Sequence, residues 1–114
     1  MSLLACPTAN CSIMPSWLWL LPQVHKFPRA YRFNLAERIQ RTAMDFQDFI
    51  VSAGKSRGDE RRTWLKKADI SLEQIRFWLR LSQELELFKI NQYEHAARMM
   101  VEMGRLLGAW IKQA

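Results

Sequence analysis

Cysteine, glycine and proline are all scarce in this chain of 114 residues, and each shortage excludes a class of protein. The only cysteines, Cys6 and Cys11, do not amount to a disulfide framework, and without two further ligands they do not make a zinc site. Glycine occurs four times and proline is absent after Pro28, whereas sheet proteins of this length need many such turn residues. We therefore expect no metal, no cofactor and no sheet.

Long hydrophobic runs and an export signal are missing as well. The apolar run from Trp17 to Leu21 is far shorter than the roughly 20 residues of a membrane span, and no basic segment precedes it. We expect no membrane association, and the cytoplasm is the predicted location.

Catalytic patterns are also missing. The chain has no Ser/His/Asp order, no glycine loop that could hold a phosphate, and no inward Glu-x-x-His pair of the kind that di-iron bundles use. His95 follows Glu94 on a polar strip, where a surface histidine is expected rather than a general base. The sequence predicts a protein that is not an enzyme.

Helix-forming residues dominate what is present, and their spacing predicts an all-α protein. Residues 1–14 show no periodicity and are expected to form a poorly ordered tail, followed by one domain over 15–114. Short connections favour an antiparallel, up-down-up-down four-helix bundle. The expected helices are a short or irregular first one from Pro15, interrupted by Pro22, and three longer ones that begin near Asn34, Asp59 and Asn91.

The last helix carries two apolar stripes at heptad spacing. The first stripe runs through Tyr93, Ala97, Met100, Gly104, Leu107 and Ile111. The second stripe includes Met99, Met103, Leu106 and Trp110. Because one core needs one stripe, we assign the first stripe to the bundle core and the second to an oligomer interface. The tryptophans of the preceding helix, Trp64 and Trp78, are expected in the core.

Basic residues, which give the chain a net charge of +6, concentrate in two segments. The first segment has five basic residues and one acidic residue; its cations are Lys26, Arg29, Arg32, Arg38 and Arg41. The second segment has six basic residues and two acidic residues; its cations are Lys55, Arg57, Arg61, Arg62, Lys66 and Lys67. If the two helix faces adjoin, these side chains would form a basic stripe that contacts nucleic-acid phosphates.

Two alternatives remain open for these segments. The cations can instead lie on two solvated helix faces that serve solubility or a protein partner. Tyr31 and Phe33 alternate with Arg29 and Arg32, so they either stack on exposed bases or anchor a loop.

The order and spacing of several segments resemble a known family over about Trp17 to Lys112. The segments are LPQVHKFPRAYRFNLAERIQ and SLEQIRFWLRLSQELELFKINQYEHAARMMVEMGRLLGAWIK, with KFPR, RFWLRL and GRLLGAWIK as the most characteristic pieces. They are similar to the accessory variability determinant (Avd) proteins of diversity-generating retroelements. These belong to a four-helix-bundle group that includes the 23S ribosomal RNA intervening-sequence proteins.

The resemblance implies a non-catalytic homo-oligomer, a pentamer in that family, with a basic surface. Its implied partners are a reverse transcriptase and its RNA, with DNA as an alternative, and its implied role is to support mutagenic cDNA synthesis. The first 14 residues depart from the family, where a long first helix would be expected. The rival interpretations are an intervening-sequence-type bundle and a structural oligomer, neither with a reverse transcriptase partner.

Overall fold

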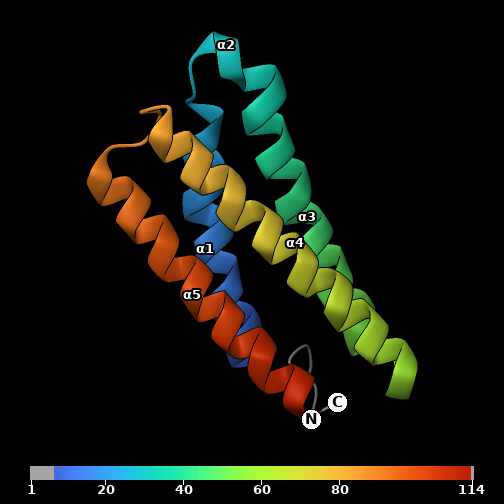
Figure 1. The fold of residues 1–114 in the computed structure, drawn as a ribbon. Coiled ribbons are helices and arrows are strands. Elements are labelled where there is room, and N and C mark those ends of the chain that lie inside the picture. Colours follow the sequence, from blue (N-terminus) through green and yellow to red (C-terminus); the bar gives the residue numbers. More distant parts are fainter. Residues whose placement is uncertain (1–6, 114) are drawn as a thin grey trace.

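The computed structural model describes residues 7–113, which form helices and short connections without a strand. The elements are α1 (Pro7–His25), α2 (Arg29–Tyr31), a π-helix (Arg32–Ala36), α3 (Glu37–Gly54), α4 (Gly58–Glu84) and α5 (Ile90–Gln113). Successive long helices run in opposite directions, and α2 lies at the upper end of the molecule (Figure 1).

The four long helices close into a bundle. Helix α3 packs along α4, α4 packs along α5, and α1 contacts both α3 and α5. The predicted antiparallel four-helix bundle is therefore confirmed. Connections α1–α3 and α4–α5 lie at one end of the bundle, which we call the upper end, and connection α3–α4 lies at the lower end (Figure 1).

Helix α1 is longer than the sequence predicted. It spans 19 residues and contains Pro15 and Pro22, both of which are exposed. The burial of Ile13, Leu20 and Val24 supplies tertiary packing that offsets the backbone hydrogen bonds the prolines remove. Of the expected N-terminal tail, residues 7–14 are thus helical, and residues 1–6 lie outside the described range.

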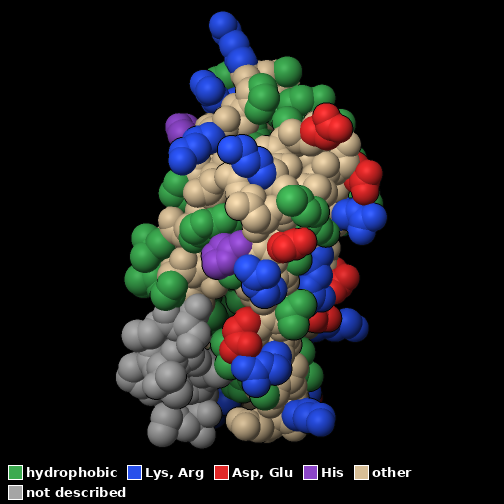
Figure 2. All heavy atoms as spheres, turned by 90° about the vertical axis from the view of Figure 1, so that its left-hand side faces the viewer, with side chains coloured by type: hydrophobic (Ala, Val, Ile, Leu, Met, Phe, Trp, Pro, Cys, Tyr) green, Lys and Arg blue, Asp and Glu red, His purple; other side chains and the backbone are tan. Residues whose placement is uncertain are grey.

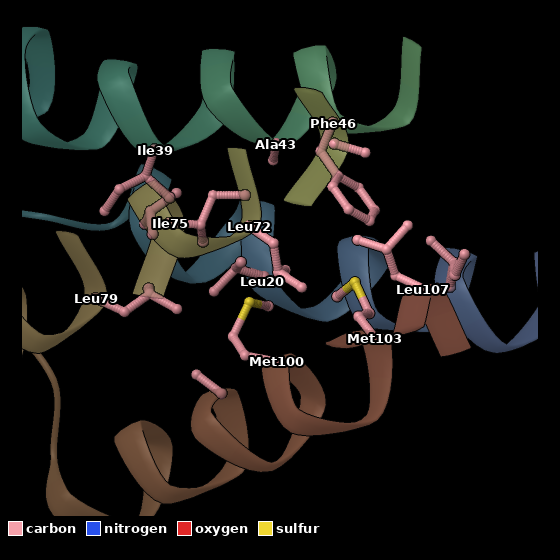
Figure 3. Close-up of a cluster of buried hydrophobic side chains, with 14 of the residues drawn as sticks. Leu20, Ile39, Ala43, Phe46, Leu72, Ile75, Leu79, Met100, Met103 and Leu107 are labelled. Carbon is pink, nitrogen blue, oxygen red and sulfur yellow. The ribbon is translucent and has the colours of Figure 1, made fainter. Parts of the chain in front are cut away.

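Apolar side chains from all four long helices meet in one core. In Figure 3, Leu20 of α1, Leu72 of α4, and Met100 and Met103 of α5 point toward one another, with Phe46 of α3 beside them. All five are at most 2% exposed. The apolar face of α3 is buried along the helix from Ile39 to Ala53, except for Phe49, which is half-buried.

The core positions of α5 lie between the two stripes rather than on the first stripe. They are Ala96, Met100, Met103, Leu107 and Trp110, spaced four and three residues apart. Met103 and Trp110 are each 2% exposed, whereas Ile111 is 41% exposed. The assignment of Met103 and Trp110 to a subunit interface is therefore wrong. The two apolar stripes are adjacent on the helix surface, and the helix is rotated so that the line between them faces the core.

In helix α4, too, the core positions differ from the predicted ones. Its core consists of Leu65, Ala68, Leu72, Ile75 and Leu79, together with two buried serines. Trp64 and Trp78 were predicted in the core and are instead half-buried at its edge, where Trp64 stacks on Phe49 and Trp78 lies beneath Arg38 of α3.

Candidate nucleic-acid and partner-binding surface

The first group of predicted cations lies at the upper end of the bundle. Lys26, Arg29 and Arg32 are exposed on the connection that contains α2 and the π-helix. Figure 2 shows lysine and arginine side chains gathered at the upper end of the molecule. Three cations on one short connection create a local positive potential that a phosphate backbone can use.

Arg38 and Arg41 extend this group along the first turns of α3. The guanidinium carbon of Arg38 lies 5.9 Å from the ring centroid of Trp78, a cation–π distance. Arg41 donates a hydrogen bond of 3.0 Å to Glu37, one turn earlier. Both partners of this ion pair are exposed, so it holds Arg41 only weakly. We call Lys26, Arg29, Arg32, Arg38 and Arg41 the upper basic group.

The second group lies at the lower end, on the α3–α4 connection and the first turns of α4. Lys55, Arg57 and Lys66 are exposed. Lys67 lies with its ammonium 4.6 Å from the ring centroid of Trp64, and Arg62 pairs with Asp59 at 2.6 Å. The two groups are therefore at opposite ends of the bundle.

Arg61 has a structural role that its position in the sequence did not reveal. Its Nε donates a hydrogen bond of 3.0 Å to the carbonyl of Ala53 at the end of α3. Its guanidinium carbon lies 5.7 Å from the ring centroid of Trp110 near the end of α5. Arg61 is half-buried and links three helices, so its contribution is to stability first.

Acidic residues separate the two basic groups on α4. Asp69 lines a hollow with Arg62 and Lys66, and it also lines the neighbouring hollow with Arg38 and Glu73. Lys66 and Trp78 are about 18 Å apart along the helix axis, from the rise of 1.5 Å per residue. The faces of α3 and α4 adjoin, as the stripe required, but the cations form two patches with carboxylates between them.

Two arginines outside these groups each form an ion pair with a neighbouring glutamate. Arg80 donates a hydrogen bond of 3.0 Å to Glu84, and this bond and the negative charge of Glu84 raise the pKa of Arg80 above its ordinary value. Glu102 raises the pKa of Arg105 in the same way. Both arginines stay charged at all physiological pH values, and both carry a local counter-charge. They are therefore suitable controls for the cations of the basic groups.

The apolar residues that are exposed differ from those expected at an interface. Met99 and Leu106, the remaining members of the predicted interface, are half-buried. Phe77 and Ile70 on the outer face of α4 are 60% and 50% exposed, one heptad apart. The interval of seven residues between Ile70 and Phe77 could be read from the sequence. It was not recognised, because other apolar residues of α4 show the same spacing.

A hollow between the π-helix and α4 was also missed. It has a volume of about 370 Å³ and is lined by Tyr31, Asn34, Arg38, Trp78, Leu81 and Leu85, among others. We call it the Trp78 hollow. Its two walls come from residues nearly 50 positions apart, so no local pattern indicated it. Phe33, the other aromatic residue of the first basic segment, is 73% exposed.

The described part of the chain shows neither a metal cluster nor a membrane span. Across residues 7–113, no group of three or more His, Cys, Asp or Glu side chains is placed to hold a metal ion. No helix within the same range is long and apolar enough to cross a membrane. Cys6 and the side chain of Cys11 lie outside what the structure describes.

Fold and surface together define an all-helical bundle protein with two basic patches and two exposed apolar side chains, Ile70 and Phe77, on the outer face of α4. A family model described as bAvd-like matches residues 12–114, and the chain belongs to this family. The resemblance to the accessory variability determinant proteins is thereby confirmed, and the chain is an accessory protein of the Avd type. A search of curated proteins found no match.

Proposed function

We propose that this Avd-type protein is a non-catalytic, cytoplasmic accessory factor that binds a reverse transcriptase and its template RNA and supports mutagenic cDNA synthesis. The observation that carries the RNA part is the upper basic group, five cations around one connection and the adjoining turns of α3, with Glu37 as the only acidic residue of that segment. Contacts to phosphates give affinity that falls with salt and depends little on sequence.

The salt dependence of RNA binding tests this assignment. For single strands, each phosphate that a cation neutralises contributes about −0.7 to the slope of log K against log salt concentration. Replacing Arg29 and Arg32 by alanine should make the slope shallower by about 1.4 and weaken binding at low salt. The measurement is fluorescence anisotropy with labelled template RNA over a salt series.

Two matched variants control for net charge. Arg80→Ala with Arg105→Ala removes the same charge from positions that Glu84 and Glu102 already neutralise, and it should leave the slope nearly unchanged. Lys55→Ala with Arg57→Ala tests, in the same way, the second group of cations at the lower end of the bundle. Equal losses in all three variants would mean that the net charge alone attracts RNA, and the upper basic group would lose its assignment.

Reverse transcriptase binding needs a separate experiment. The tagged protein, expressed with a reverse transcriptase and template RNA from the same element, should bring down both. A structural oligomer should bring down neither, and an intervening-sequence-type bundle should not bring down the polymerase. Retention of the polymerase after nuclease treatment would identify a direct protein contact.

We propose further that the protein is a homo-oligomer, a pentamer as in the family it resembles, and that Ile70 and Phe77 contribute to the subunit contact. Burying a phenylalanine or isoleucine side chain typically contributes roughly 1.5–3 kcal/mol. Phe77→Glu should reduce the sedimentation coefficient. Met44→Glu on α3, where the native side chain is 57% exposed, is the matched control. Met99→Glu tests the second stripe, and dissociation by that variant alone would place the contact on α5.

A further inference from the structure

We infer that the Trp78 hollow binds one unpaired nucleobase of RNA, with the adjoining phosphate at Arg38; this rests on the proposed RNA binding. The hollow lies beside the upper basic group, between residues 31–38 and the last turns of α4. It therefore supplies what the basic group lacks, a surface for the base rather than for the backbone.

The walls suit a flat aromatic ligand. Tyr31 and Trp78 are half-buried aromatic residues, and Leu81 and Leu85 complete an apolar lining. At about 370 Å³ the hollow falls within the range of small-ligand pockets in proteins. Bases stack on aromatic side chains in most proteins that hold single strands, since every base has a π-face.

Charge distinguishes this hollow from its neighbour. A second hollow of about 370 Å³ lies on the other side of Trp78 and shares Arg38 as a wall. That second hollow is lined by Asp69, whose carboxylate repels a phosphate, and by Glu73, which pairs with Arg76, whereas no carboxylate lines the Trp78 hollow. Of the acidic residues next in sequence to this lining, Glu37 and Glu84 each pair with an arginine, and Glu86 is exposed beyond the end of α4. The positive charge of Arg38, with no carboxylate in the lining, favours a nucleotide with its phosphate over a peptide with an uncharged side chain.

Few polar groups remain to read the base edge. The side-chain amide of Asn34 donates to the carbonyl of Ala30, and its oxygen accepts from the backbone N–H of Leu35. The guanidinium of Arg38 lies over the ring of Trp78, and both residues line the hollow. Recognition should then follow stacking strength, with purines bound more tightly than pyrimidines.

The test compares two probes of equal length, a short single-stranded oligoadenylate and its abasic counterpart, by fluorescence anisotropy. The native protein should bind oligoadenylate about tenfold more tightly, a factor of the order that one stacked base supplies. Trp78→Leu should bind both probes alike while keeping its affinity for the abasic one. Trp64→Leu is the matched control, because Trp64 is half-buried on the same helix but already stacks on Phe49, with ring centroids 6.0 Å apart.

The outcomes separate the two proposals. If the native protein binds neither probe, RNA binding itself is refuted; if it binds both equally, RNA binding stands and the base site is refuted. A preference that survives in Trp78→Leu also refutes the site, and loss of reverse transcriptase co-purification in that variant would show that the hollow takes a peptide. Thermal unfolding followed by circular dichroism checks the fold. If Trp78→Leu does not fold, Tyr31→Leu must abolish the preference.

Discussion

Replacing Gly104 by alanine is predicted to destabilise the bundle, although alanine is the better helix former. A Cβ at this position would collide with Nη2 of Arg76, which crosses over Gly104 from α4. The same Nη2 donates a hydrogen bond of 3.1 Å to the carbonyl of Met100, and Nη1 pairs with Glu73. The absence of a side chain at Gly104 is therefore what allows the arginine to reach α5.

Two opposing terms set the magnitude. Glycine to alanine in a helix interior stabilises by about 1 kcal/mol. A hydrogen bond from a charged donor contributes roughly 1.5–3 kcal/mol, and the low end applies because the Arg76 side chain is 36% exposed. The net expectation is a loss of about 0.5–1 kcal/mol in the free energy of unfolding. In an Arg76→Ala background, Gly104→Ala should instead stabilise by about 1 kcal/mol.

Urea unfolding followed by circular dichroism, at one protein concentration, measures this double-mutant cycle. Gly108→Ala is the matched control, because nothing lies within 4 Å of the Cβ it would add. It should stabilise by about 1 kcal/mol in both backgrounds. Equal effects of the two alanine substitutions in the native background would refute the crossing of Arg76 over Gly104.

Three further substitutions have expected effects on stability. Arg61→Ala should lower the free energy of unfolding by about 1.5–3 kcal/mol in urea unfolding, whereas the exposed neighbour Arg62→Ala should change it by less than about 0.5 kcal/mol. Glu86→Gly should raise it by about 0.5–1 kcal/mol in the same assay, because Glu86 has a φ of 62° at the end of α4. Trp110→Glu should unfold the subunit at moderate temperature in a thermal melt, because it places a carboxylate in the core; a cooperative melt near that of the native protein would contradict the burial of Trp110.

The periodicity of apolar residues was sufficient to predict the fold but not the rotation of every helix. Helix α3 has one apolar face, which leaves a single rotation, and the residues of this face from Ile39 to Ala53 are buried apart from the half-buried Phe49. Helices α4 and α5 carry apolar residues over a wider arc, and several rotations satisfy the heptad spacing equally well. Only the neighbours decide among them, which is why Met103 and Trp110 were misplaced.

The candidate site was predictable in residue type but not in role. Arg61 and Arg62 are adjacent in sequence and chemically identical, yet a rotation of about 100° per residue directs one toward Ala53 and Trp110 and the other toward solvent. Helix α1 shows a second limit, because propensity alone argues against the prolines that packing tolerates. Contacts between residues far apart in the sequence determine both the role of Arg61 and the length of α1.

Phe77 and Trp78 show how self-association and nucleotide binding can share one helix. The two rings meet edge to face, with centroids 5.0 Å apart, but Phe77 lines only the hollow that contains Asp69 and Glu73. A second subunit seated on Ile70 and Phe77 would therefore cover the acidic hollow. The Trp78 hollow, on the Tyr31 side of the same tryptophan, would stay open beside the upper basic group. Because Arg38 and Trp78 line both hollows, the subunit contact and the bound base would meet at these two side chains.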